Sequence, residues 1–273
     1  MLARTILTVL LACMSQAAPA ADVPLTPTEQ LTAVKLTRLR GVRIWWNDEN
    51  RIIGVALKGV NATDQTVQLA SRLPLLRSLV LVAVRDQSLT DAGIAALRNA
   101  NRLEVLFIVG SDVTDRGLQN IAALPRLRVL VLKGQFTDDA FDVIAQLHKL
   151  EFLDMTQTRV TDAGLKRLTA LKKLQTLILN GTSVTDAGVE AISRIGTLRW
   201  LYLGDTPVDD KAIDSLTRLQ GLNELYVSGT QISKKGFQTL RSAMSTSCEI
   251  YFGDKVYRGT RAQPAGVAVA TTP

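Results

Sequence analysis

The sequence predicts an α/β solenoid in which short parallel strands line the inside of an arc and helices cover the outside. Two observations predict this fold. An apolar LxxLxL pattern recurs eight times, starting at residues 52, 76, 103, 127, 150, 174, 198 and 222, so that successive copies lie 23 to 27 residues apart. Within each copy, apolar residues first alternate, as in a strand, and then follow helical spacing. One such unit cannot bury its apolar side alone, whereas stacked units bury it between them.

The turn from strand to helix carries a second repeated motif, VTDAG, at residues 160–164 and 184–188. We expect Thr161 or Asp162 to bind the free N–H groups at the start of the following helix, where an acidic residue also suits the helix dipole. The equivalent position holds Asp in seven units and Lys234 in the last: Asp64, Asp91, Asp115, Asp138, Asp162, Asp186 and Asp210. A carboxylate column that binds calcium is the alternative, but capping explains each Asp separately, so we expect no metal.

Two further columns of small or polar residues follow the same period. One position in the first helical turn is always small and is expected to let each helix lie close to its own strand: Gly93, Gly117, Ala140, Gly164, Gly188, Ala212 and Gly236. A polar position after each strand is expected to satisfy backbone groups inside the turn: Ser111, Gln135, Thr158, Thr182, Thr206 and Thr230.

These units resemble the leucine-rich repeats of the ribonuclease-inhibitor-like, or cysteine-containing, type, and are similar to secreted bacterial proteins built from VTDAGL repeats. The resemblance covers about residues 51–245. It implies a leucine-rich-repeat horseshoe of about eight repeats of 23–27 residues, with a parallel β-sheet on the concave face and helices on the convex face. It also implies a non-catalytic scaffold that binds a protein or peptide through the concave face, without identifying that partner.

The N-terminus has the pattern of a secretory signal peptide, predicted over residues 1–20. Arg4 precedes an apolar run from Thr5 to Met14, and Ala18-Pro19-Ala20 forms a cleavage site. We therefore expect a soluble protein that is secreted or lies in the periplasm or cell envelope. Cys13 stands in LLAC, which is similar to the lipobox of bacterial lipoproteins, so lipidation of Cys13 is the alternative to simple cleavage.

The remaining segments are predicted to close the ends of the solenoid. Residues 21–50 are expected to form an N-terminal cap made of a helix and the start of a β-hairpin, and residues 246–258 a C-terminal cap strand. Residues 259–273 have no pattern that could bury apolar surface and are expected to be disordered. The second unit is longer than its neighbours at Ala83–Ser88, which is interpreted as a surface loop near the concave face or as neutral drift.

The candidate partner-binding residues lie between the leucines, at positions that face the concave side. They form an apolar patch and an aromatic strip, and the full set is Val80, Val82, Val105, Phe107, Val109, Val129, Val131, Phe152, Trp200, Tyr202 and Tyr226, with Tyr251 as a further candidate. Val and Tyr also favour strands for their own sake, but a contiguous exposed patch with aromatic anchors indicates an interface. Replacing Phe107 or Trp200 with Asp is expected to abolish partner binding and to leave the fold intact.

The composition is apolar and basic, with 47% hydrophobic residues and a formal net charge of +7. Basic residues cluster at four places: Lys166-Arg167, Lys172-Lys173, Lys234-Lys235, and Lys255 with Arg258 and Arg261. An anionic partner such as nucleic acid, an acidic glycan or a lipid surface is one interpretation, and a solvated helical face is the one we favour. Export argues further against nucleic acid.

The sequence offers little support for an enzyme. His148 is the only histidine and lies in an inter-repeat loop without a nearby ligand or catalytic partner, and no GxSxG, Walker, HExxH or paired-cysteine motif occurs. Cys248 is the only cysteine of the folded part, so no intrachain disulfide is expected. We predict no catalytic residue, no cofactor and a monomer. Two other functions stay open: a substrate-recognition subunit of an F-box ubiquitin ligase, and a binder of glycan or envelope material, for which Trp200 and Tyr202 are the hint.

Overall fold

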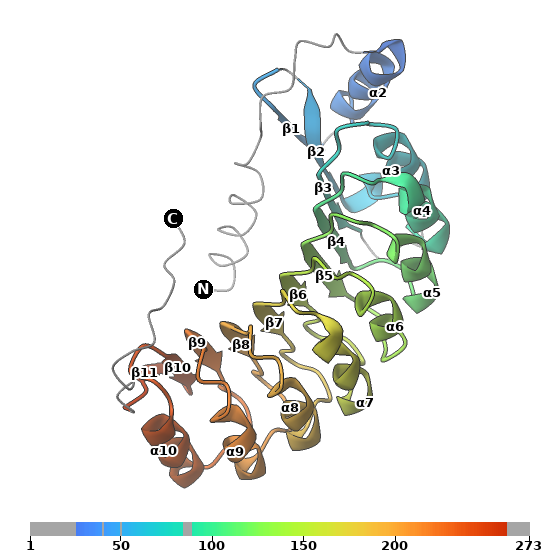
Figure 1. Ribbon diagram of the computed structural model, residues 1–273. Helices are drawn as coiled ribbons and strands as arrows, with labels where there is room; N and C mark the ends of the chain where they lie inside the picture. The colour runs from blue at the N-terminus through green and yellow to red at the C-terminus, as the bar shows by residue number, and fades with distance from the viewer. Residues whose placement is uncertain (1–25, 40, 50, 84–88, 261–273) are drawn as a thin grey trace.

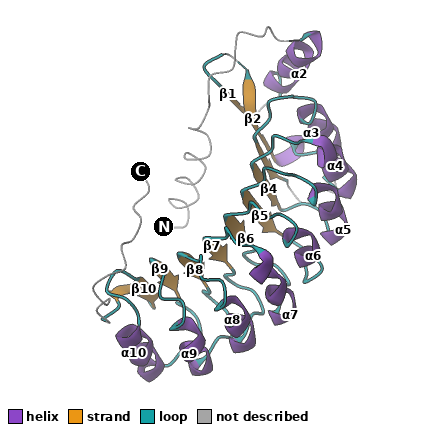
Figure 2. Cartoon of the chain, viewed as in Figure 1, coloured by secondary structure: helices purple, strands orange, loops and turns teal. Residues whose placement is uncertain are grey.

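The computed structural model describes residues 26–39, 41–49, 51–83 and 89–260. These residues form one curved solenoid, with strands on the concave side and helices on the convex side (Figure 1, Figure 2). The predicted fold class is therefore confirmed. The predicted signal peptide, Cys13, residues 84–88 of the extra loop and residues 261–273 of the predicted tail lie outside the described residues.

The described strands form one 11-stranded sheet in chain order. They are β1 (Arg43–Trp46), β2 (Ile52–Lys58), β3 (Ser78–Val82), β4 (Val105–Val109), β5 (Val129–Lys133), β6 (Phe152–Asp154), β7 (Thr176–Ile178), β8 (Trp200–Tyr202), β9 (Glu224–Tyr226), β10 (Glu249–Phe252) and β11 (Lys255–Arg258). Strands β2 to β10 run parallel, and each LxxLxL pattern pairs in register with the next, as where Leu106 lies opposite Leu130. Antiparallel β1 and β11 close the two ends of the sheet.

The helices are short and lie one after another along the convex side. The α-helices are α2 (Pro27–Thr37), α3 (Asp64–Ala70), α4 (Asp91–Ala95), α5 (Asp115–Leu118), α6 (Ala140–Ile144), α7 (Asp162–Leu165), α8 (Asp186–Ile192), α9 (Ile213–Leu216) and α10 (Lys234–Ala243). Short 3₁₀ helices extend several of them: η2 (Ala96–Asn99), η3 (Gln119–Ile121), η4 (Lys166–Ala170) and η5 (Asp210–Ala212), while η1 (Gly59–Asn61) precedes α3. Helices of this length are unstable alone in water, so packing against the sheet must hold them. Over the described ranges, none has the length and apolar character that crossing a membrane requires.

The main core lies between the sheet and the helices and consists of the repeated leucines. Leu153 and Leu177 from the strands and Leu168 from the helical layer are fully buried. Burial of each such side chain stabilises the fold by roughly 1.5–3 kcal/mol relative to an exposed one. Since the same positions recur in every unit, the core runs without interruption along the solenoid.

The conserved-looking spacing of the Asp residues has a different explanation from the one the sequence predicts. Thr161 caps its own helix, because its Oγ1 accepts from the Ala163 N–H at 3.3 Å. Asp162 instead accepts from the next unit: Thr185 N lies 2.8 Å from Oδ1, and Thr185 Oγ1 lies 2.6 Å from Oδ2. The same link joins other neighbouring units and is called the aspartate ladder: Asp64–Thr90, Asp91–Thr114, Asp115–Thr137, Asp138–Thr161, Asp162–Thr185, Asp186–Asp209 and Asp210–Ser233.

The aspartate ladder also explains the column of glycines. A Cβ atom added to Gly188 would overlap Asp162 Oδ1, and one added to Gly164 would overlap Phe141 and approach Asp138 Oδ1. The prediction that these small residues bring a helix close to its own strand was therefore incomplete. What they clear at both positions is space for side chains of the preceding unit.

The polar column after the strands behaves as predicted at its threonines. Thr158, Thr182, Thr206 and Thr230 each donate through Oγ1 to the backbone carbonyl three residues earlier, at 2.6–2.7 Å. Gln135 departs from the pattern because its side chain is exposed. The buried hydroxyls satisfy carbonyl groups that the tight turn would otherwise leave unpaired.

The two ends of the solenoid are closed by different devices. At the N-terminal end, Glu29 of α2 is buried and pairs with Arg51 at 2.5 Å, and Thr26 forms a capping box with Glu29. At the C-terminal end, the predicted cap strand is followed by a second strand, so β10 and β11 form a hairpin, and Phe252 stacks on Phe237 of α10. Gly259 and Thr260, which the sequence places in a disordered tail, donate backbone hydrogen bonds to Cys248 and Arg241.

Candidate functional site

The concave face carries a second apolar cluster, separate from the main core. Its buried members are Val105, Phe107, Val129, Val131, Phe152, Ile178 and Tyr202, and Val80, Val109, Trp200 and Tyr226 pack against them with partial exposure. We call this set the concave cluster. It brings together all of the predicted partner-binding residues except Val82, which lies half-buried at the end of β3. Phe152 and Ile178 join the predicted apolar patch to the predicted aromatic strip, so the two form one surface.

The degree of burial differs from what the sequence predicts. Val105, Val129, Val131 and Phe152 expose at most 2% of their surface, and Phe107 exposes 8%. In-register strands lie about 4.8 Å apart, and the inner side of a curved sheet crowds the side chains of neighbouring strands against one another. The prediction that Phe107→Asp would leave the fold intact is therefore wrong, because it would place a charge in a buried apolar position.

A carboxylate that the predicted site omitted lies within the concave cluster. Asp154 is fully buried between Val131 and Ile178, its in-register neighbours. Its Oδ1 accepts from Thr156 N at 2.8 Å and from Thr156 Oγ1 at 2.5 Å, whereas Oδ2 has no hydrogen bond to a described residue and lies 3.5 Å from Lys133 Nζ. A buried carboxylate among apolar side chains is costly unless it binds donors. The sequence signal for it is that Asp154 is the only charged residue among the fifth positions of the repeats.

The aromatic strip continues to the C-terminal end of the concave face. Tyr202, Tyr226 and Tyr251 stack in a row, with ring centroids 6.2 Å and 5.8 Å apart. Tyr202 donates to Glu224 Oε2 at 2.7 Å. Burial raises the pKa of Tyr251 to about 12, and the neighbouring Glu224 and Glu249 carboxylates raise it further. The tyrosines are therefore neutral and act as a rigid apolar surface with polar edges.

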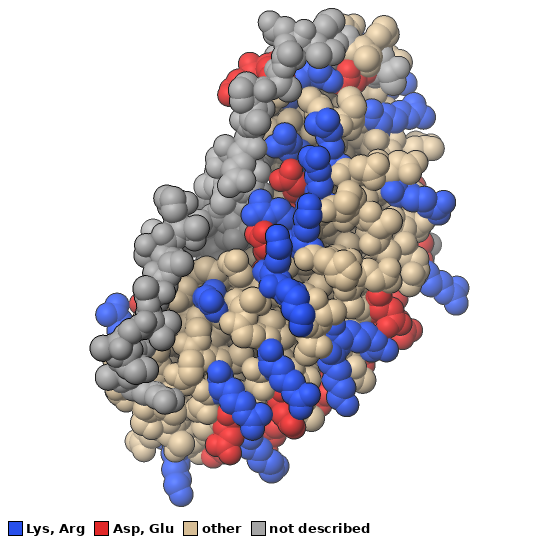
Figure 3. Space-filling view, in the orientation of Figure 1, with Lys and Arg blue, Asp and Glu red and all other residues tan. Residues whose placement is uncertain are grey.

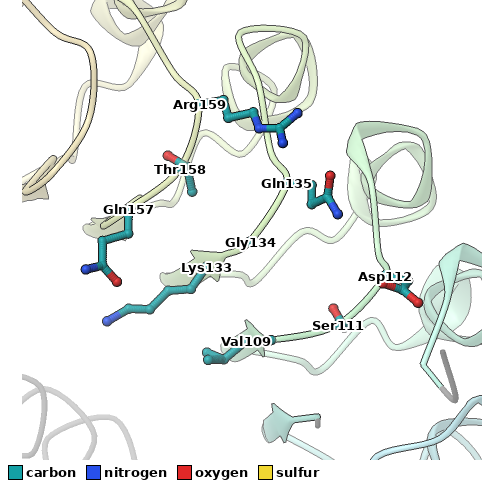
Figure 4. Close-up of a pocket in the computed structure, with 10 residues that line it drawn as sticks. Val109, Ser111, Asp112, Lys133, Gly134, Gln135, Gln157, Thr158 and Arg159 are labelled. Atoms are coloured by element: carbon teal, nitrogen blue, oxygen red, sulfur yellow. The ribbon is translucent and has the colours of Figure 1, made fainter. Parts of the chain in front are cut away.

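A shallow pocket of about 490 Å³ lies beside the concave cluster, at the carboxyl ends of β4, β5 and β6. Its lining includes Val109, Lys133, Gln135, Gln157 and Arg159. Figure 4 shows Lys133 and Gln157 extending to the same side of the pocket, while Arg159 and Gln135 project from the loops on its other side. The pocket therefore adds hydrogen-bond donors next to an apolar surface. Only Val109 of this lining was among the predicted site residues.

The residues with chemical reactivity do not gather into a catalytic site. Burial raises the pKa of the Cys248 thiol to about 12, with Glu224 and Glu249 adding to the rise, so this thiol is not a nucleophile near neutral pH. His148 is exposed in its loop. In the part of the chain that the structure describes, no three His, Cys, Asp or Glu residues are grouped as metal ligands. The geometry on the concave face suits binding by apolar contact and hydrogen bonding.

Three solved structures have a similar solenoid at low sequence identity. The ectodomain of the membrane receptor kinase GASSHO1/SCHENGEN3 from Arabidopsis thaliana, solved with CASPARIAN STRIP INTEGRITY FACTOR 2, is 14% identical with a TM-score of 0.49, over 89% of this chain and 29% of that one. Internalin C2 from Listeria monocytogenes str. 4b F2365 is 17% identical with a TM-score of 0.47, over 76% of this chain and 93% of that one. A TDR receptor is 14% identical with a TM-score of 0.46, over 72% of this chain and 37% of that one.

Two consecutive repeats, residues 146–168 and 170–193, match the family described as Leucine Rich repeat. Among curated proteins, none is similar enough to this sequence to count as a match. The matched repeats are units of the continuous parallel sheet and share its strand, turn and helix order with their neighbours. The chain is thus a leucine-rich repeat protein with an α/β solenoid fold.

Proposed function

We propose that this protein is an exported, non-catalytic scaffold that binds a protein or peptide on its concave face. The observation that carries the proposal is the concave cluster, an apolar surface separate from the core on the side of the sheet opposite the described helices (Figure 1). Its buried valines and Phe152 form a rigid floor, and the half-exposed Val80, Val109, Trp200 and Tyr226 stand ready for contact. Interfaces concentrate their binding energy on such anchored aromatic side chains.

Asp154 supports a partner that supplies a hydrogen-bond donor. Its unbonded Oδ2 lies inside the concave cluster, and Lys133 approaches it only to 3.5 Å. An N–H group or a cationic side chain of a bound peptide would satisfy this oxygen. The apolar floor favours a peptide over a sugar chain, which presents mostly hydroxyl groups.

Export and the repeat subtype are parts of the same proposal. Export rests on the signal-peptide pattern of residues 1–20. The VTDAGL units support the ribonuclease-inhibitor-like type of leucine-rich repeat. The absence of catalytic function rests on the high thiol pKa of Cys248 and the isolated position of His148.

Site-specific photo-crosslinking on the full chain tests where the partner binds. A photoreactive residue would replace Val109 or Tyr226 on the concave face, or Lys166 or Ser242 on the convex helices, before incubation with an extract of the compartment that contains the protein. We expect the same discrete partner to be crosslinked from both concave positions and from neither convex position. Equal crosslinking from the convex positions would overturn the proposal.

Matched substitutions then test the contacts themselves with the identified partner. Trp200→Ala should weaken binding by about 2 kcal/mol or more, as at an interface anchor. Trp46→Ala removes an exposed Trp from the edge strand β1 and should leave the affinity unchanged. Asp154→Asn retains the shape of the side chain, removes its charge and should weaken binding roughly tenfold. Unchanged affinity in both Trp200→Ala and Asp154→Asn would place the binding site elsewhere.

A further inference from the structure

The edge of the solenoid where helices return to strands carries a repeated positive charge. Each of the first seven helix-to-strand connections holds an exposed Lys or Arg, and we call this set the basic band: Arg72, Arg102, Arg126, Lys149, Lys173, Arg194 and Arg218. Figure 3 shows Lys and Arg side chains gathered in a band that follows the arc of the molecule. The repeat architecture therefore converts one basic residue per unit into a continuous charged edge.

These charges have no structural role among the described residues. None of the seven side chains forms an ion pair there. The same connections contain two acidic residues, Glu104 and Glu151, and Glu151 is already bound by Arg128 at 2.8 Å. Helix dipoles do not account for the band either, because Arg102, Arg126 and Lys149 lie beyond the helix ends and the dipole effect is confined to the last turn.

The arrangement of the basic band suits a chain-like anion. Successive strands lie about 4.8 Å apart, so the band presents one cation per unit in single file along the arc. A linear polymer with regularly spaced negative charges can bind all of these positions together. Five of the seven are arginines, whose planar guanidinium groups bind carboxylate or sulfate through two hydrogen bonds at once.

The surroundings of the basic band separate the classes of polyanion. The connections contain no Phe, Tyr or Trp on which nucleobases could stack. None of the exposed large hydrophobic side chains, Leu31, Val34, Trp46, Val60 and Val256, lies in these connections, so none could insert there into a lipid layer. We propose that this edge binds a linear acidic polysaccharide through carboxylate or sulfate groups. This site is separate from the concave face and does not depend on the proposed peptide partner.

The test compares the affinity of the full chain for polygalacturonate with that for the fully methyl-esterified polymer, which keeps the sugar backbone and loses the charge. We expect binding to the charged polymer that weakens with salt, and no binding to the ester. The triple variant R102Q/R126Q/K149Q should weaken binding roughly tenfold or more, as three exposed charges predict. The control K58Q/K234Q/K255Q removes the same net charge from exposed positions outside the band and should retain wild-type affinity.

Three results would overturn the proposal. Equal loss of affinity in the two triple variants would mean that only net charge matters. Tighter binding to a single-stranded oligonucleotide or to phosphatidylglycerol vesicles than to polygalacturonate would assign the band to another class of partner. Binding of the esterified polymer with equal affinity would show that the charges are not the recognised groups. Crosslinking from Val109 and Tyr226 is independent of these outcomes, so failure here leaves the concave proposal intact.

Discussion

The two edges of this solenoid carry opposite charges at the same period and use them in different ways. On the edge where strands pass into helices, the aspartate ladder links unit to unit, and Asp162 accepts two hydrogen bonds from Thr185. On the edge where helices return to strands, the side chains of the basic band have no ion pair with a described residue. A charge repeated in every unit can therefore be a part of the fold on one edge and be free for a partner on the other.

The difference shows why repetition alone does not separate structural from functional residues. Both sets recur about every 24 residues in the sequence. What separates them is geometry: an Asp side chain is short and meets donors of the next unit, whereas Lys and Arg side chains extend into solvent. Substitutions on the two edges should therefore differ in their effect on stability, as the following four predictions state.

The largest effect is expected for Gly188→Ala on the ladder edge. The added Cβ would overlap Asp162 Oδ1 and press on Val184 and Leu165, which should lower the free energy of unfolding by about 3 kcal/mol. The matched control is Gly196→Ala on the opposite edge, where a Cβ would have no neighbour within 4 Å. Urea unfolding of both variants gives the comparison, and equal stabilities would show that the ladder does not restrict the space around Gly188.

A smaller loss is expected for Asp162→Ala, which removes both hydrogen bonds to Thr185. The loss should be about 2 kcal/mol, because charged hydrogen bonds contribute more than neutral ones and this site is partly exposed. Asp142→Ala serves as the control, since Asp142 makes only an exposed ion pair with Arg167 at 2.7 Å. A double-mutant cycle with Thr185→Ala should show coupling between the two ladder residues, and additive effects would contradict a direct link.

The weakest rung of the ladder should be improved by Asp209→Thr. Here Asp186 accepts from Asp209 N at 2.9 Å and faces a second carboxylate instead of a hydroxyl. Burial raises the pKa of Asp186, and repulsion from Asp209 raises it further, so the charged form is disfavoured at neutral pH. Thr would restore the donor found at the other rungs, and we expect a modest rise in Tm at pH 7. The reverse exchange, Thr185→Asp, should lower Tm, and a change of the same sign in both variants would refute this account.

The smallest effect on stability is expected on the basic band. Lys173→Gln should change the free energy of unfolding by less than about 0.5 kcal/mol, because the side chain is exposed and has no ion pair with a described residue. Calorimetry at low and high salt would measure the difference. A loss as large as that of Asp162→Ala would mean that the two edges are both structural and would remove the basis for a partner on the band.

The sequence predicted the fold well because one unit determines its own local structure. The LxxLxL pattern predicted the strands in register, and the threonine column was placed correctly inside the turns. The candidate site was predicted less completely. Its residues do form one cluster, but the burial of Val105 and Phe152 and the isolated carboxylate oxygen of Asp154 were missed. These features depend on how closely the side chains of different units approach one another, which the pattern within one unit does not contain.

By itself, the sequence determined the repeat, the order of strand, turn and helix, and which residues face the concave side, because these follow from spacing along the chain. Only the tertiary structure decided that Asp162 bonds to Thr185 in the next unit, that Gly188 makes room for it, and that the basic band stays without such links. The physical reason is that hydrogen bonds and burial depend on distances between residues about 24 positions apart. The stacking and curvature of the solenoid set those distances.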